Sequence, residues 1–220
     1  MTLYRVNKKF ASTVERSDRV LECAESFGLG LQEKNFIVYD DFQLEIKQGD
    51  IIYITGQSGS GKSLLLKELA VMMETGTKLK LANIDAVELE DKPLIDQIGK
   101  TTEEAIRILS LAGLNDAYLF IRKPKELSDG QLYRFRIAKL MGSDADVWVA
   151  DEFGAVLDRT TAKVVGFSLQ KFARLLNKTV LVATTHKDLR EELAPDIYVD
   201  KRFRERVEVD IKRVQDEVKG

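Results

Sequence analysis

The chain has 220 residues, which is enough for one sizeable domain or two small ones. Apolar residues make up 44% of it and charged residues 32%, so we expect a real core and a well-solvated surface. The net charge of −2 excludes a whole-protein field for holding nucleic acid, although a local basic patch is compatible with it.

Cysteine content and hydropathy indicate the compartment. No apolar run approaches the ~18 residues that span a bilayer, and the start of the chain does not resemble a signal peptide. Cys23 is the only cysteine, so no internal disulfide can form and a reducing compartment is expected. We expect its thiol to be buried and inert. The sequence therefore predicts a cytoplasmic protein without a membrane span.

The first quarter of the chain predicts a small β part, one helix and one buried strand. Residues 2–6 predict a short strand. Apolar residues at helical spacing predict a helix from Ser17 to Phe27, with Gly28 as its C-terminal cap. Alternating apolar and polar residues predict a strand from Ile37 to Ile46. The unbroken β-branched and aromatic run at 51–55 predicts a strand that is buried on both faces.

The remaining elements alternate between helices and strands. Capping boxes at Thr101 and Ser128 predict two helix starts, and Gly113 ends the first of these helices. Two more buried strands are predicted at 147–150 and 179–183, with a long helix from Thr161 to Leu176 between them. Alternation predicts an edge strand at 207–211. Strands that alternate with helices indicate a parallel α/β sheet.

An eight-residue turn after the strand at 51–55 has the form G-x-x-x-x-G-K-[ST] and precedes an apolar helix, as a phosphate-binding loop requires. Its glycines let backbone N–H groups point at phosphate oxygens, and the helix N-terminus favours negative charge. We expect Lys62 to reach the outer phosphates and the Ser63 hydroxyl to bind Mg²⁺. A glycine turn that merely joins strand to helix is the disfavoured alternative. The predicted nucleotide-binding residues are Gly56, Gln57, Ser58, Gly59, Ser60, Gly61, Lys62 and Ser63.

Two acids follow the predicted strand at 147–150. Asp151 is expected to hold Mg²⁺, directly or through water, and Glu152 to orient the water that attacks the γ-phosphate. An acidic cap for the next helix is the alternative for this pair. The phosphate-binding loop favours the catalytic role.

The segment Leu127-Ser128-Asp129-Gly130-Gln131 resembles the signature of the ATP-binding-cassette (ABC) ATPase superfamily, which usually reads L-S-G-G-Q. It lies between the phosphate-binding loop and the acidic pair, which is the order in that family. The resemblance implies that Ser128, Gly130 and Gln131 of one subunit cover the γ-phosphate held by another, in an ATP-dependent head-to-tail homodimer. An ordinary capping box is the alternative for this segment alone. Asp129 departs from the usual glycine and places an acid near a phosphate site.

Two further segments match the same family. Residues 154–158 resemble its D-loop, which implies that Asp158 lies near the dimer contact and belongs to the nucleotide-binding residues. Residues 184–186 resemble its switch region, which implies that His186 senses the γ-phosphate, whereas a lone histidine is otherwise more often structural.

The family's glutamine and its adenine-stacking aromatic are less clearly marked. Gln97 is the candidate for the Q-loop glutamine, as a catalytic residue and a metal ligand. The stacking residue stays open among Phe27, Phe36 and Tyr39.

The sequence thus predicts an α/β fold, with a P-loop NTPase core, a parallel sheet and a small N-terminal antiparallel β part. We expect one ABC ATPase domain, with a nucleotide-binding core at about 1–95 and 143–220 and a short helical part at about 96–142. The expected function is binding and hydrolysis of Mg-ATP to drive an unidentified soluble protein partner. The short helical part favours that role over the alternative, the nucleotide-binding subunit of a membrane transporter. A nucleotide-switched module with negligible turnover is disfavoured by Lys62, Asp151, Glu152 and His186.

Overall fold

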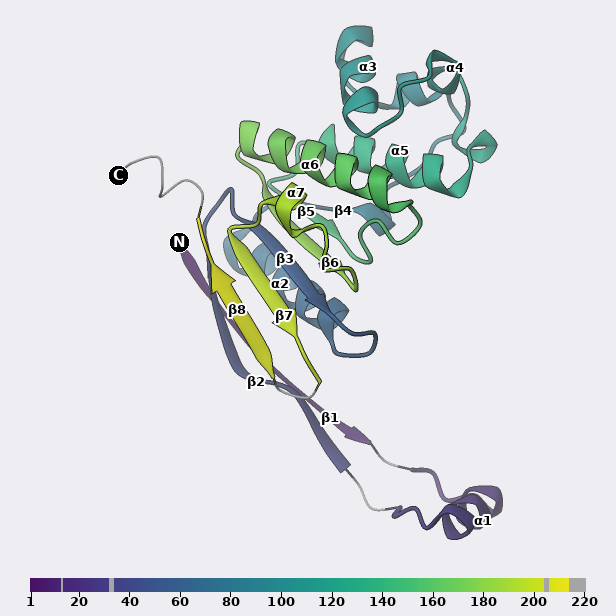
Figure 1. Cartoon of the computed structure of the whole chain (residues 1–220), viewed down its shortest axis with the longest axis vertical. Coiled ribbons are helices and arrows are strands. Elements are labelled where there is room, and N and C mark those ends of the chain that lie inside the picture. The colour runs from purple at the N-terminus through teal and green to yellow at the C-terminus, as the bar shows by residue number, and fades with distance from the viewer. Residues whose placement is uncertain (13, 32–33, 204–205, 214–220) are drawn as a thin grey trace.

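A six-stranded sheet forms the centre of the protein, in a computed structural model that describes residues 1–12, 14–31, 34–203 and 206–213 (Figure 1). The strand order is β4-β5-β6-β3-β7-β8, and every neighbouring pair is parallel except β7 and β8. The predicted α/β fold with a parallel sheet is confirmed. The strands are β3 (Ile51–Gly56), β4 (Leu81–Asn83), β5 (Val147–Ala150), β6 (Thr179–Thr184), β7 (Ile197–Lys201) and β8 (Val207–Ile211).

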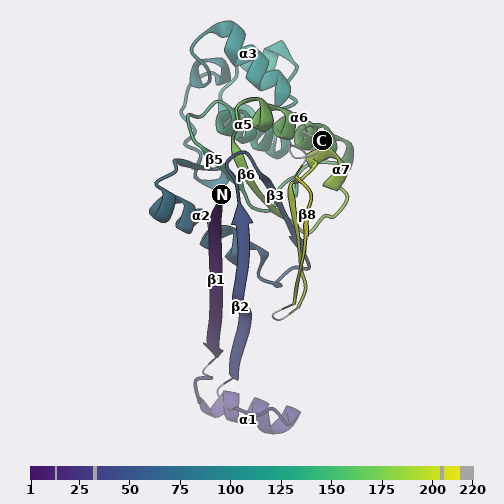
Figure 2. The ribbon, with the colours of Figure 1, turned by 90° about the vertical axis from the view of Figure 1, so that its left-hand side faces the viewer.

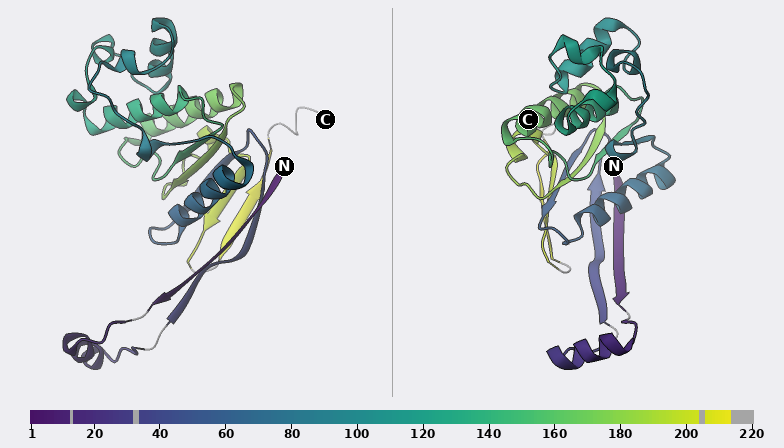
Figure 3. Two further views of the ribbon diagram at one scale, coloured as in Figure 1. Left: turned by 180° about the vertical axis from the view of Figure 1, so that it is seen from behind. Right: turned by 90° about the vertical axis from the view of Figure 1, so that its right-hand side faces the viewer.

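Helices cover both faces of this sheet (Figure 3). Helix α2 (Lys62–Thr77) packs on one face. On the opposite side of the sheet lie α5 (Asp129–Met141), α6 (Arg159–Leu175) and α7 (Arg190–Leu193), and α3 (Thr102–Leu111) and α4 (Ala117–Phe120) lie farther from the sheet, beyond α5 and α6 (Figure 1). Short 3-10 turns span Ile84–Ala86, Leu94–Gln97 and Pro124–Glu126. Among the described residues, no helix combines the length and the apolar character that crossing a membrane requires.

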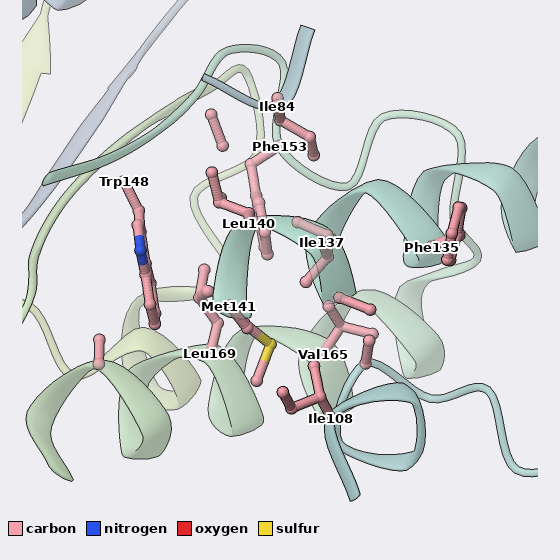
Figure 4. Close-up of a cluster of buried hydrophobic side chains, with 14 of the residues drawn as sticks. Ile84, Ile108, Phe135, Ile137, Leu140, Met141, Trp148, Phe153, Val165 and Leu169 are labelled. Atoms are coloured by element: carbon pink, nitrogen blue, oxygen red, sulfur yellow. The ribbon is translucent and has the colours of Figure 1, made fainter. Parts of the chain in front are cut away.

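Two separate apolar clusters hold these layers together. One joins α2 to inward-facing residues of the sheet such as Ile52, Val149 and Leu181. The other fills the space between the sheet and helices α3, α5 and α6 (Figure 4). Trp148 of this cluster stacks on Phe172, with ring centroids 6.3 Å apart. Successive residues of a strand point to opposite faces, so a strand that serves both clusters is apolar throughout.

A long antiparallel hairpin, β1 (Thr2–Ser12) and β2 (Lys34–Ile46), forms a second sheet (Figures 1 and 2). Near its base, side chains such as Tyr4, Val6 and Leu44 are buried against α2. The outer half extends beyond the rest of the protein and carries helix α1 at its end. Both strands are longer than the sequence pattern predicts, because the outer half has little apolar alternation to mark it.

Helix α1 (Asp18–Phe27) begins and ends as its capping residues predict. The Ser17 hydroxyl accepts the N–H of Val20, and Gly28 takes the left-handed conformation at φ 62°. The expectation of a buried Cys23 was wrong, because this thiol is exposed. Ala24 is the one residue of α1 that is buried, so the described residues at the end of the hairpin do not form a core around this helix.

The long helix α6 starts two residues earlier than predicted. Its first residue is Arg159, because the Asp158 carboxylate accepts the N–H of Thr161 at 2.9 Å and so serves as the N-cap. The resemblance to the D-loop implies nucleotide binding and a nearby dimer contact for Asp158, and does not predict this capping role. The helix nevertheless ends at Leu175, within a residue of the prediction.

Candidate functional site

Three neighbouring strands end at the same edge of the sheet, and each is followed by a segment that the sequence analysis singled out. The P-loop follows β3, the acidic pair follows β5, and Thr185-His186 follows β6. Strands β5, β6 and β3 are adjacent and parallel, so their carboxyl ends lie side by side. In open parallel sheets this edge is where ligands bind.

Two glycines of the P-loop have no room for a side chain. Gly56 has φ 148°, and a Cβ there would lie 2.0 Å from the carbonyl oxygen of Lys201. Gly61 has φ 103°, and a Cβ there would lie 2.6 Å from Cγ1 of Val38. A side chain at either position would therefore push the loop off β7 or off β2.

Lys62 lies where the loop and the acidic pair meet. Its ammonium donates to the carbonyl oxygen of Gln57 at 2.8 Å, which folds the side chain back over the loop. Burial lowers the pKa of Lys62, and the negative charges of Asp151 and Glu152 oppose that shift. The structure thus brings one cation and two carboxylates together at this edge.

The loop fits a phosphate group. The Ser60 hydroxyl is buried, and among the described residues it has no hydrogen-bond partner. The loop leads directly into α2, whose first N–H groups have no intrahelical acceptor. A bound phosphate would satisfy such donors. For Mg²⁺, the Ser63 hydroxyl and the Asp151 carboxylate offer the hard oxygen ligands that this ion prefers, with the remaining positions left to water and phosphate.

The acidic turn holds Glu152 in an unusual backbone conformation. Its φ is 46°, in the left-handed region that non-glycine residues rarely adopt. The N–H of Glu152 donates to the Asp151 carboxylate at 3.0 Å, and that of Gly154 donates to the Tyr133 hydroxyl at 2.9 Å. Since Asp158 caps the next helix, the alternative role of this pair as a helix cap is not supported. Strain of this kind is characteristic of functional sites.

His186 is fixed through its backbone. Its N–H donates to the Thr184 hydroxyl at 3.3 Å, and its carbonyl oxygen accepts the buried Tyr53 hydroxyl. The imidazole itself is half-buried. The structure therefore orients the segment and leaves the ring partly accessible at the carboxyl edge.

Ser128 and Gln131 form the capping box that was the alternative for the signature segment. The Ser128 hydroxyl accepts the N–H of Gln131, and the Gln131 side chain accepts the N–H of Ser128 at 3.0 Å. Ser128 is nevertheless exposed, and at Gly130 a Cβ would meet nothing closer than 3.8 Å. The capping box and a contact with a second subunit are thus compatible.

Gln97 has many local partners. Its amide nitrogen donates to the carbonyl oxygens of Glu90 and Lys92, and its amide oxygen accepts the N–H of Glu90 at 3.1 Å and the Lys139 ammonium at 3.4 Å. These bonds hold the loop before the helical part against α5. A role of Gln97 in metal binding stays a prediction, and the structure gives its side chain a structural task.

Asn83 is a competing candidate that the sequence analysis missed. It ends β4, and it pairs in parallel register with Val149 of β5. Val149 belongs to the apolar cluster on the α2 face, so the Asn83 side chain lies on that face as well. Asp151 follows the end of β5, and its charge acts on Lys62 of the P-loop, so both residues lie at the carboxyl edge near the loop. The Asn83 side-chain oxygen also accepts the N–H of Asp85 at 3.0 Å, so Asn83, like Gln97, has a local structural bond. The sequence pattern did not mark Asn83 as the end of a strand, because β4 has only three residues.

The structure also narrows the choice of adenine-stacking aromatic. Tyr39 is fully buried, so it offers no free ring face, and Phe27 lies on α1 at the far end of the hairpin (Figure 1). Phe36 remains, and it pairs across the hairpin with Phe10, which the sequence analysis missed; both rings are about half exposed. Phe10 shares a strand face with Lys8, which contacts Glu68 of α2. The rings of Phe10 and Phe36 thus lie on the face of the hairpin that packs on α2.

Comparisons with known proteins concern the family and the fold. The sequence model of the family described as "ABC transporter" matches residues 39–155, just over half of the chain. A methionine import ATP-binding protein, MetN 1 of Oenococcus oeni, is 24% identical over 76% of this chain and 57% of its own length. An uncharacterised ABC transporter ATP-binding protein of Methanocaldococcus jannaschii is 25% identical over 73% of this chain and 67% of its own length. This chain thus spans little more than half the length of the MetN relative.

Solved structures show the same fold. A dimeric ATP-binding cassette in a post-hydrolysis state, bound to ADP and Pi, superposes with a TM-score of 0.65 at 18% identity. The match covers 94% of this chain and 98% of that one.

Replacing Lys62 tests the P-loop. Lys62→Ala removes the cation that is predicted to contact the outer phosphates, so we expect ATP binding to weaken by at least ~10-fold, the loss of about 1.5–3 kcal/mol from one charge-assisted contact. Isothermal titration with Mg-ATP measures this. Lys67→Ala, which removes an exposed lysine from the same helix, should bind normally. Unchanged affinity and hydrolysis in Lys62→Ala would exclude this loop as the phosphate site.

Asn83 and Gln97 can be separated by a matched pair of alanine variants. If Asn83 is the polar group that faces the metal, Asn83→Ala should lower the ATP hydrolysis rate by about 10-fold or more and raise the Mg²⁺ concentration at half-maximal rate. Gln97→Ala should mainly lower the melting temperature, because it frees the loop at residues 90–92. Steady-state hydrolysis rates across a Mg²⁺ titration distinguish the two residues. If Gln97→Ala lowers the rate and Asn83→Ala lowers only the melting temperature, Gln97 is the residue that faces the metal.

Proposed function

This chain belongs to the ABC transporter family, and from that premise we propose that it binds and hydrolyses Mg-ATP as the nucleotide-binding subunit of a membrane transporter. The supporting observation is that relatives matching about three quarters of the chain are named ATP-binding proteins of importers. The comparisons thus favour the role that the sequence analysis held as the alternative. We place the subunit on the cytoplasmic side, where ATP is supplied.

The proposed chemistry divides among residues at the carboxyl edge. Lys62 and the N–H groups of the P-loop bind the outer phosphates, and Ser63 and Asp151 hold Mg²⁺, which neutralises phosphate charge. Glu152 orients the attacking water and accepts its proton. His186 contacts the γ-phosphate from the neighbouring strand end.

A second copy of the chain completes each site in this proposal. Ser128, Gly130 and Gln131 of one subunit close on the γ-phosphate held by the other, and Asp158 lies near the contact. The exposure of Ser128 and the open space at Gly130 support this arrangement, as does the dimeric form of the structural neighbour.

A groove suited to a partner's helix lies between the loop at 88–92 and α5. It has a volume of about 290 Å³ and is lined by Leu89, Pro124 and Leu132, with charged residues at its rim. A transporter subunit has to grip a segment of its membrane partner, and an apolar floor with a charged rim suits that task. The groove adjoins Lys125, two residues before the signature segment, so a partner there is placed to sense closure of the dimer.

Locking the chain in its ATP state tests chemistry and assembly together. Glu152→Gln keeps the shape of the side chain but removes the base, so hydrolysis should fall by about 10²-fold or more while ATP binding persists. Sedimentation should then show a dimer with Mg-ATP and a monomer with ADP.

Two further variants are controls for this dimer. In the Glu152→Gln protein, Ser128→Arg should abolish the dimer, because the arginine side chain would fill the space that the second subunit's γ-phosphate occupies. Thr102→Arg, at the start of α3, should leave the dimer intact. A Glu152→Gln protein that stays monomeric with nucleotide bound would disprove the head-to-tail arrangement.

Association with a membrane subunit is tested in the protein's own host. The tagged chain should co-purify from detergent-solubilised membranes with an integral membrane protein, and Leu89→Asp should abolish that association by placing a charge on the groove floor. Val71→Asp, which alters an exposed site on α2, should not. If the chain is instead recovered without a membrane subunit and hydrolyses ATP at full rate without lipid, the role on a soluble partner is favoured.

A further inference from the structure

Tyr39 lies beneath the P-loop, with its hydroxyl directed at the loop backbone. The side chain is fully buried, and its hydroxyl donates to the carbonyl oxygen of Gly61 at 3.0 Å. The same carbonyl accepts the N–H of Leu65 at 3.1 Å, so two donors hold its two lone pairs. The orientation of the Gly61 carbonyl is therefore fixed from two sides.

That orientation also sets the direction of a neighbouring donor. The peptide between Gly61 and Lys62 is trans and planar, so the N–H of Lys62 points away from the carbonyl. Lys62 is the first residue of α2, and its N–H is one of the groups without an intrahelical acceptor. When Tyr39 holds the carbonyl below the loop, the Lys62 N–H faces the phosphate side.

The Tyr39 ring is itself held in place. In the hairpin, Lys8 of β1 pairs with Tyr39 and the next residue, Lys9, pairs with Ile37. Val38 is therefore the extra residue of a β-bulge. The Lys201 ammonium lies 5.0 Å from the Tyr39 ring centroid and donates to the Arg202 carbonyl at 2.8 Å. A buried ring between a bulge and a buried cation has few alternative positions.

Burial also keeps the hydroxyl a donor. It raises the pKa of Tyr39 well above its usual value, so the group stays protonated at neutral pH. The ring edge lies close to the loop as well, since a Cβ at Gly61 would be 3.7 Å from Cε2 of Tyr39.

We propose that Tyr39 is a positioning residue for nucleotide binding, which acts through the Gly61–Lys62 peptide to aim the Lys62 N–H at the outer phosphates. Tyr39 does not touch the nucleotide; its effect passes through one peptide plane. The inference rests on the proposed ATP-binding function.

Tyr39→Phe tests this proposal, because it removes the hydroxyl and keeps the ring. The Kd values for Mg-ATP and Mg-ADP should both rise about five-fold, as expected for one misdirected hydrogen-bond donor, while kcat at saturating ATP stays near that of the wild type. Tyr4→Phe makes the same chemical change in the same apolar cluster and should leave both Kd values unchanged. Binding is measured by calorimetry at a temperature well below every variant's Tm.

The outcomes separate the two claims. If the wild type binds no ATP, the proposed function fails. If the wild type binds ATP and Tyr39→Phe binds ATP and ADP equally well, the positioning role is overturned, whether or not its Tm falls. A lower Tm with unchanged affinity would identify the hydroxyl as only a structural link between β2 and α2.

Discussion

The parallel pairing of β5, β6 and β3 is the constraint on which the rest of this structure depends. These strands are buried on both faces, so their interiors are apolar and polar groups are displaced to their ends. Register then decides which ends meet. Thr184 pairs with Thr55, and Ala150 pairs with Val182, so the segments that follow begin at nearly the same height. A cation, two carboxylates and a histidine that are far apart in sequence become neighbours because three apolar strands share one edge.

The hairpin adds a second constraint from the opposite side of α2. Its base packs on that helix, while Val38 and Tyr39 reach the P-loop backbone. Across the sheet, Lys201 of β7 closes on the same loop, with its carbonyl oxygen against Gly56. The loop is therefore enclosed between β2 and β7, and these neighbours require glycine at positions 56 and 61 as much as any ligand does. Phosphate affinity in such a loop depends on packing that lies outside the motif itself.

Sequence reasoning succeeded where a feature is local and failed where it depends on pairing. The buried strands, the helix starts at Thr101 and Ser128 and the cap at Gly28 follow from short-range patterns, and the structure confirms them. Strands β4 and β7 were not predicted, because segments of three and five residues show little periodicity. Asn83 was missed because it belongs to β4. Phe10 was missed because its partner, Phe36, lies across a hairpin whose outer half has no apolar alternation. Burial of Cys23 was predicted from the usual burial of this residue type, but the described residues around α1 form no core that would bury it.

Several site residues have a structural role and a proposed functional role at once. The Ser128 hydroxyl caps α5, and the Asp158 carboxylate caps α6, with its pKa lowered by its bonds to Thr161. Glu152 shows a different relation, because its left-handed backbone costs about 1–3 kcal/mol. Its carbonyl oxygen accepts the N–H of Ala155 at 3.0 Å, so the residue opens a tight turn. The neighbouring contacts offset that cost: Phe153 is buried and donates its N–H to Ala183 of β6, and Gly154 donates to Tyr133 of α5. The turn that carries Glu152 is thus held by β6 on one side and by α5 on the other. A movement of α5 that followed closure of a second subunit on Ser128 would therefore reach Glu152 through Tyr133 and Gly154, without any contact between the two subunits at the acidic turn.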